Sequence, residues 1–124
     1  MLFIDSSIWL DHFSNINERA STVIEGERML ACSILTLFEV KKRLIRLKVA
    51  KDKIDTALEF LKVRAVIIPP TEEIVHKAVE VSVNHNLGAI DALIYASALS
   101  EKAQLITADH DFHGLPDVEI IEHI

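Results

Sequence analysis

Residues 2–13, LFIDSSIWLDHF, decide the fold class of this chain. The stretch opens with a short apolar run, which indicates a buried strand. The aspartate and two serines that follow are residue types that begin helices, and the next apolar residues have helical spacing with a mixed polar and apolar face. The stretch therefore predicts a strand, a cap and a helix, with Asp5 placed where the strand ends.

The rest of the chain repeats this alternation of short apolar runs and longer segments with helical spacing. We expect strands at residues 2–4, 29–33, 65–68, 104–107 and 118–121. We expect helices at about residues 8–13, 17–25, 36–49, 52–64, 71–86 and 89–102, with a loop or single turn at 109–114. Strands that alternate with helices predict an α/β fold, with a mainly parallel sheet of about five strands and helices on both faces.

Composition excludes several classes of protein. Of the 124 residues, 50% are hydrophobic and 26% are charged, which is unlike a disordered or collagen-like chain. No apolar run approaches the ~20 residues that span a bilayer, and the opening MLFID does not fit a secretory leader. Cys32 is the only cysteine, so a disulfide within the chain and a cysteine metal cage are both excluded. We therefore expect one cytoplasmic domain, residues 1–124, in which any metal is held by carboxylates or histidines.

Charge is segregated along the chain. The formal net charge is −6, which argues against a protein that coats nucleic acid by charge alone. Residues 41–53 nevertheless hold 7 of the 13 basic residues. This segment, with Lys42, Arg43 and Arg46 at helical spacing, either guides nucleic-acid phosphates or an acidic partner, or is an ordinary solvated helix face.

Two aspartates follow predicted strands. Asp5 ends the first strand and Asp109 comes two residues after the fourth. The carboxyl ends of parallel strands share one edge of a sheet, and open α/β sheets bind ligands beyond that edge. Each aspartate taken alone is equally explained as a helix cap or a turn residue.

Two further carboxylates are ambiguous from the residues alone. Asp91 stands in an apolar segment, where it is either a buried functional group or a first-turn residue that interacts with free helix N–H groups. Glu39 lies at helical spacing from Lys42 and Arg43, so an exposed ion pair explains it equally well. The residue pattern leaves open whether either carboxylate reaches the edge that carries Asp5 and Asp109.

Four segments of the chain, taken together, resemble the PIN-domain family of metal-dependent ribonucleases. They are LFIDSSIWLDHF at 2–13, LTLFEV at 35–40, IDALIYASA at 90–98 and LITADHDF at 105–112. The resemblance covers essentially the whole chain in order and spacing. It implies a PIN-like three-layer α/β/α sandwich, and compact members of this size are most often VapC-type toxins of toxin–antitoxin pairs.

The resemblance also implies roles for individual residues. It makes four acids both catalytic and metal-binding: Asp5, Glu39, Asp91 and Asp109. Four further residues match supporting positions: Ser6, Ser7, Thr107 and the peripheral Asp111. All-oxygen ligands select hard ions, so Mg²⁺ or Mn²⁺ is expected. The implied activity is hydrolytic cleavage of RNA by a homodimer that an antitoxin protein inhibits, with no membrane involved.

The chain departs from the family pattern in small ways, and other interpretations stay open. Many members carry Asn or Ser at the position of Ser7, and His110 stands between two of the acids, where it can alter pH dependence. A non-toxin PIN nuclease in RNA processing and a non-catalytic PIN-like binding module remain alternatives. A phospho-acceptor receiver domain is disfavoured because Ser6, not a second acid, follows Asp5. A zinc site at His110 and His113 is a weaker reading than a capped surface turn.

Three aromatic residues complete the sequence-based expectations. We expect Trp9, Phe13 and Phe38 to lie in the core. Any exposed part of this set would suit an antitoxin helix or a second subunit.

Overall fold

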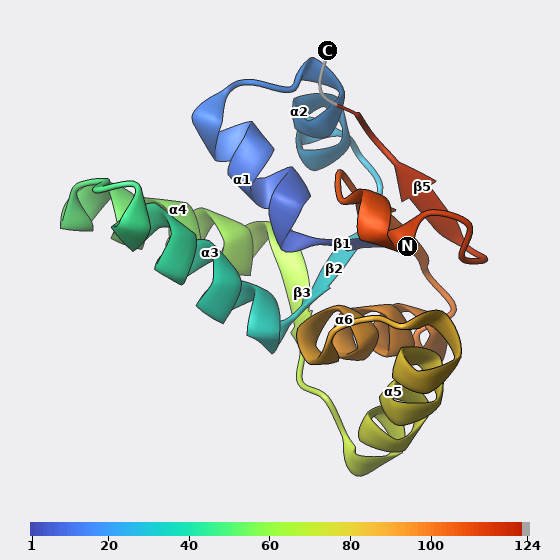
Figure 1. Cartoon of the computed structure of the whole chain (residues 1–124). Helices are drawn as coiled ribbons and strands as arrows, with labels where there is room; N and C mark the ends of the chain where they lie inside the picture. Colours follow the sequence, from blue (N-terminus) through green and yellow to red (C-terminus); the bar gives the residue numbers. More distant parts are fainter. Residues whose placement is uncertain (123–124) are drawn as a thin grey trace.

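The computed structural model describes residues 1–122 and contains a five-stranded sheet in which every neighbouring pair is parallel. The strand order is β3-β2-β1-β4-β5 (Figure 1). The strands are β1 (Leu2–Ile4), β2 (Leu30–Ser33), β3 (Ala65–Ile68), β4 (Gln104–Thr107) and β5 (Val118–Ile120). The predicted α/β class with a mainly parallel sheet of about five strands is confirmed.

Six α-helices cover the two faces of the sheet. They are α1 (Ser6–Ser14), α2 (Glu18–Glu25), α3 (Ile34–Arg46), α4 (Lys51–Arg64), α5 (Glu72–His85) and α6 (Ala89–Ser100). The first four helices pack on one face, and α5 and α6 pack on the other (Figure 1). A single 3₁₀ turn, η1 (His110–Phe112), follows β4. The molecule is therefore a three-layer α/β/α sandwich, as the family resemblance implies.

Both faces of the central strand β1 are buried. Leu2 and Ile4 belong to the core cluster under α1 to α4, whereas Phe3 belongs to the cluster under α5 and α6. Side chains along a strand alternate between faces, so an apolar run without alternation is the pattern of a strand buried on both sides. This explains why the short run at the start of the chain so clearly predicts a central strand.

Helix α6 is the most buried helix of the fold, as its nearly uniform apolar composition predicts. Its buried residues are Ala92, Ile94, Tyr95, Ala96, Ser97 and Ala98. Both hydroxyls in this run are satisfied: that of Ser97 donates to the backbone carbonyl of Leu93 at 2.7 Å and that of Tyr95 to the carbonyl of Pro116 at 2.8 Å. None of the helices within residues 1–122 has the length and apolar character needed to span a bilayer.

Helix α3 begins and ends earlier than the predicted range 36–49. The Ser33 side chain accepts a hydrogen bond from the Leu35 N–H at 3.1 Å and caps the helix. The helix therefore begins at Ile34, two residues before the predicted start. At the other end, Lys48 adopts a left-handed conformation with φ 61°. Its N–H donates to the Ile45 carbonyl at 2.9 Å and closes the helix.

The expectation of a core position is right for Trp9 and wrong for Phe38. Trp9 is 0% exposed, and Phe13 is partly buried against the same cluster. Phe38 is 61% exposed. Helix α3 buries Val40 and Leu44, and Phe38 is rotated about 200° from Val40 around the helix axis. An aromatic residue within an amphipathic helix is thus not sufficient to predict burial.

Candidate active site

The candidate site lies where the strand order reverses. The chain proceeds from β1 outward to β2 and β3 on one side, then returns to β4 and β5 on the other side of β1. The carboxyl ends of β1 and β4 are therefore adjacent and diverge into different connections, which is the geometry of ligand sites in open α/β sheets. Asp5 follows β1 directly, and Asp109 follows β4 by two residues.

Asp5 is held by hydroxyl groups rather than used as a helix cap. It occupies the N-cap position of α1, but its side chain makes no capping hydrogen bond. Its Oδ2 accepts from Thr107 Oγ1 at 2.7 Å and from Ser7 Oγ at 2.8 Å. Asp5 is only 4% exposed, and this burial raises its pKa, while the hydroxyl donors act in the opposite direction. The carboxylate is thus fixed in position by two donors from separate segments.

The same two hydroxyls also fix the loop after β4. Ser7 Oγ accepts from the Ala108 N–H at 2.9 Å, and Thr107 Oγ1 accepts from the Asp109 N–H at 3.0 Å. Each hydroxyl therefore donates to Asp5 and accepts from the backbone that carries Asp109. Two of the residues that the family resemblance implies as supporting residues, Ser7 and Thr107, thus contact Asp5 directly.

Glu39 projects from α3 into the same region. The Ser6 side chain acts to lower the pKa of Glu39, whereas Glu39 Oε1 is buried and has no hydrogen-bond partner among residues 1–122. Burial, followed by the charges of Asp5 and Asp91, raises the pKa of Glu39 to about 7. Within the same residues Glu39 forms no ion pair with the cations that follow it on α3, so the alternative of an exposed pair is wrong.

Asp91 lies in the first turn of α6 and joins the other acids. Burial, followed by the charges of Asp5, Asp109 and Asp111, raises its pKa to about 6. Carboxylate oxygens of Asp91, Asp109 and Asp111 lie within 4.8 Å of one another. Asp109 also caps η1 by accepting from the Asp111 N–H at 2.9 Å, so its turn role and its place in the cluster coexist.

The residues present fit a hard divalent cation. The five carboxylates come from four segments of the chain, and the negative charges of neighbouring acids help to raise the pKa values of Asp5, Glu39 and Asp91. A bound cation would relieve this repulsion. Glu39 Oε1 is a buried acceptor that has no donor in the described part of the chain. The ligand group contains oxygen donors only and, over residues 1–122, no histidine joins it. This donor set suits Mg²⁺ or Mn²⁺ and does not suit the alternative of a zinc site at His110 and His113.

The predicted nucleic-acid-binding residues line a groove beside the acidic cluster. Its volume is about 240 Å³. Its lining residues are Phe38, Glu39, Lys42, Arg43, Arg46 and Ile90. Glu39 belongs both to this groove and to the cluster, so the groove begins where the carboxylates are.

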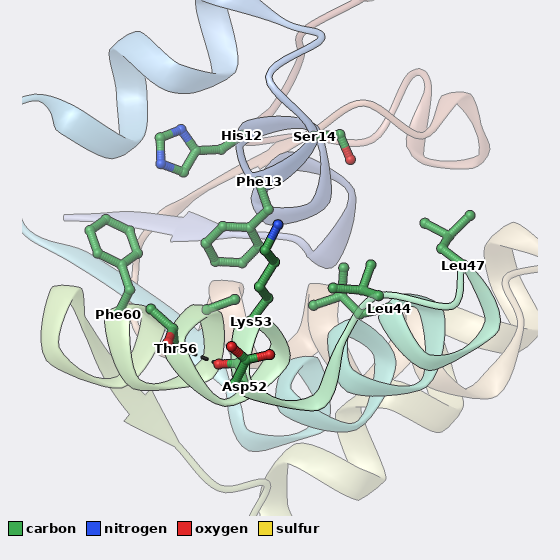
Figure 2. A pocket seen from close by; sticks show the side chains of 11 residues that line it. His12, Phe13, Ser14, Leu44, Leu47, Asp52, Lys53, Thr56 and Phe60 are labelled. Carbon is green, nitrogen blue, oxygen red and sulfur yellow. Dashed lines mark hydrogen bonds between the residues drawn. The ribbon is translucent and has the colours of Figure 1, made fainter.

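A larger apolar groove was not foreseen from the sequence. It has a volume of about 580 Å³ and lies between the end of α1 and the pair of helices α3 and α4. Figure 2 shows His12 and Phe13 of α1 facing this space, opposite Phe60 of α4. The His12 and Phe60 rings stack with centroids 5.7 Å apart. The sequence shows Phe60 within a helix expected at 52–64, but only the structure shows that this ring is 40% exposed.

Comparison with solved structures finds close matches to the whole fold. A toxin–antitoxin complex from Klebsiella pneumoniae contains a chain with 25% identity and a TM-score of 0.83, with 100% of both chains covered. VapBC2 from Rickettsia felis, bound to a DNA fragment from its promoter, matches with 19% identity and a TM-score of 0.80 over 97% of this chain and 98% of the other. The sarcin-ricin loop cleaving toxin VapC20 of Mycobacterium tuberculosis matches with 20% identity and a TM-score of 0.78 over 98% and 99%.

Comparison with curated proteins finds no match. The sequence model of the PIN domain family, in contrast, matches residues 2–118. This match includes all five clustered carboxylates and the whole of strands β1 to β4, and it ends at the first residue of β5. The chain therefore belongs to the PIN domain family.

Proposed function

We propose that this protein is a metal-dependent endoribonuclease that hydrolyses RNA phosphodiester bonds, and that it is the toxin of a VapBC-type toxin–antitoxin pair. The observation that carries the proposal is the convergence of five carboxylates at the strand-order reversal, in a chain whose residues 2–118 match the PIN domain model. We assign residues 1–124 to a single PIN domain.

The proposed cofactor is Mg²⁺ or Mn²⁺, held by Asp5, Glu39, Asp91 and Asp109, with Asp111 at the periphery. The support is the group of carboxylate oxygens from Asp91, Asp109 and Asp111, and the Glu39 Oε1 that has no hydrogen-bond partner among the described residues. Such a cation, when bound, neutralises phosphodiester charge and lowers the pKa of a water that attacks phosphorus.

The chain's own residues prepare the site. Thr107 and Ser7 orient Asp5 and, through the same oxygens, hold the backbone at Asp109. Because its pKa is about 7, Glu39 is partly protonated at neutral pH before a cation binds. Glu39 would have to be ionised to hold a cation, so the affinity for that cation would rise with pH.

Two observations support the toxin assignment and its partner. One relative is a toxin–antitoxin complex that matches this chain over its full length at 25% identity. The apolar groove at Phe13, Leu44 and Phe60 is open to receive an apolar segment of an antitoxin (Figure 2). We place homodimer formation and a cytoplasmic location within the same proposal, as the family resemblance implies.

A cleavage assay tests the enzymatic part. A labelled structured RNA is incubated with purified protein in Mn²⁺, in Mg²⁺ and in EDTA, with Asp5→Asn beside wild type. We expect cleavage in the divalent cations only, and none by Asp5→Asn. Asp55→Asn is the matched control, because Asp55 is an exposed carboxylate of α4 whose pair with Lys51 contributes little.

The assay also separates the alternatives. Cleavage by Asp5→Asn at the wild-type rate contradicts the site. An absence of cleavage, together with no thermal stabilisation by Mn²⁺, favours a non-catalytic binding module.

Expression in a bacterial host tests the toxin role. We expect wild type to arrest growth, Asp5→Asn to leave growth unchanged, and the product of an adjacent small gene to restore growth beside wild type. Metal-dependent cleavage without growth arrest favours a nuclease of RNA processing.

A further inference from the structure

The groove beside the acidic cluster has an exposed aromatic ring at its edge. Phe38 is 61% exposed, the most of the five phenylalanines, whereas Phe3 and Phe112 are 0% exposed. The Lys42 Nζ lies 5.4 Å from the centre of the Phe38 ring. The exposed Phe38 ring therefore offers an apolar face at the edge of the groove. A ligand that covers this face would gain the free energy of burying it.

The cations of the groove have no carboxylate partners. Within residues 1–122, none of Lys42, Arg43 and Arg46 forms an ion pair. The whole chain carries a formal charge of −6, so these three cations make the groove locally positive on a protein that is negative overall. Unpaired cations that line a groove attract a polyanion locally even when the net charge of the protein is negative.

We propose that Phe38 is a stacking platform for an unpaired base of the RNA substrate, while Lys42, Arg43 and Arg46 contact the adjoining backbone phosphates. A cationic groove with an aromatic ring is the combination that binds single-stranded nucleic acid. The inference rests on the proposed ribonuclease function and adds Phe38 as a residue that positions an unpaired nucleotide beside the cleaved bond.

The position of the platform fits this role. Phe38 and Glu39 are consecutive residues of α3, and Ile90 of the same groove precedes Asp91. An RNA strand whose base stacks on Phe38 therefore has its backbone close to the carboxylates. Bases within a duplex already stack on their neighbours and do not present a free face to such a ring.

Charge favours RNA over a second copy of the chain as the occupant. A twofold interface brings the same patch of each subunit together. An interface centred on this groove would place Lys42, Arg43 and Arg46 opposite their own copies, where like charges repel. Phosphate groups, in contrast, complement all three.

The test is an equilibrium binding measurement in EDTA, where the proposed cleavage is blocked. The probe is a single-stranded RNA of about 12 nucleotides that contains fluorescent 2-aminopurine, free or annealed to its complement. We expect Phe38→Ala to weaken single-strand binding about tenfold and to leave duplex binding unchanged. Phe38→Trp should retain the wild-type affinity and Phe38→Leu should not, because Leu is apolar without an aromatic face.

Ile45→Ala is the matched control. Ile45 lies on the same helix and is 56% exposed, but it does not line the groove. We expect its affinity for the single strand to equal that of wild type. Equal weakening of single-strand and duplex binding by Phe38→Ala, or no weakening, overturns the proposal. A Phe38→Ala protein that also loses subunits in analytical ultracentrifugation assigns the ring to an interface between copies and likewise overturns it.

The outcomes for stacking and for cleavage are separable. If wild type cleaves RNA in Mn²⁺ but Phe38→Ala binds the single strand as wild type does, the platform is wrong and the ribonuclease stands. If wild type does not cleave but its single-strand binding depends on an aromatic residue at position 38, the platform stands and the cleavage proposal fails.

Discussion

At the scale of single residues, Glu39 connects the function of the site to the stability of the fold. Its pKa is about 7 against an ordinary value of 4.5, and the pKa of Asp91 is about 6 against 3.8. The folded chain therefore binds more protons than the unfolded chain between about pH 4 and 7. The stability of the metal-free protein accordingly falls as pH rises through this window, because the folded state must ionise clustered, half-buried carboxyls.

Replacement of Glu39 by Gln should relieve this cost. We expect Glu39→Gln to raise the free energy of unfolding by about 1 kcal/mol at about pH 8 in EDTA, after allowance for solvent screening, and to change it little at about pH 4. Urea unfolding at both pH values measures the effect, and the same variant should lose cleavage in Mn²⁺. Lower stability of the variant at about pH 8 would show that Glu39 contributes favourable contacts that outweigh its charge.

Thr107 supplies a second test at this scale. Thr107→Val keeps the side-chain shape but removes the oxygen that donates to Asp5 and accepts from the Asp109 N–H. We expect a loss of about 1–3 kcal/mol in the free energy of unfolding, and cleavage reduced about tenfold or more. Thr107→Ser retains the hydroxyl and should cleave nearly as wild type does. Equal cleavage by the two variants would contradict a positioning role for this oxygen.

The residue pattern predicts some members of the site and not others. Asp5 and Asp109 are found because each follows a recognisable strand, and parallel strands place both at one edge. Glu39 gives no such signal, since cations one turn away explain it without tertiary structure. Only the family resemblance selects it from the sequence, and only the fold shows that its Oε1 is buried. The exposure of Phe38 likewise depends on which face of α3 meets the sheet.

At the scale of elements, α3 has two distinct faces. One face, with Val40 and Leu44, packs in the core, and the other carries Glu39 together with the cations of the groove. The amphipathic pattern predicts the first face alone, because helical periodicity describes burial and not the chemistry of exposed side chains. The left-handed Lys48 then ends the helix and allows α4 to return beside it (Figure 1).

The turn between α3 and α4 contains removable strain. Lys48 has φ 61°, a conformation that disfavours side chains with a Cβ atom. We expect Lys48→Gly to raise the free energy of unfolding by about 0.5–1 kcal/mol. Lys41→Gly, at an exposed position inside α3, is the control for loss of a lysine and should lower it by about 1 kcal/mol. Urea unfolding measures the free energy of unfolding of both variants. A lower value for Lys48→Gly than for wild type would rule out strain at this turn.

At the scale of the whole molecule, charge is divided between an acidic body and a basic segment. If the groove cations contact RNA phosphates, each contact releases counterions and contributes to the salt dependence of binding. We expect Lys42→Glu and Arg46→Glu to weaken RNA binding and to make the plot of log affinity against log salt concentration less steep. Lys51→Glu makes the same charge change on α4 and should affect both quantities much less. Unchanged binding in the groove variants would leave this segment a solvated helix face.

The global arrangement is only partly contained in the sequence pattern. Alternating strands and helices predict the class and the parallel sheet, which the structure confirms. They do not predict that β4 returns to pair with β1, because two helices and many residues separate β3 from β4. That pairing brings Asp91 and Asp109 to Asp5. The resemblance to a family provided this information, which local periodicity lacks.

The pairing of β1 with β4 sets when the carboxylate cluster can exist during synthesis of the chain. The hydrogen bond from Thr107 to Asp5 joins residues 102 positions apart, and the site needs elements that include Glu39 and Asp91 between them. While residues up to Asp109 are still being added on the ribosome, β4 cannot yet pair with β1, and the acids stay apart. If the chain has the proposed ribonuclease activity, a nascent chain has no assembled site and is inert toward RNA until the fourth strand has emerged from the ribosome. An antitoxin of the proposed kind, recognising the assembled fold, has that interval in which to be made.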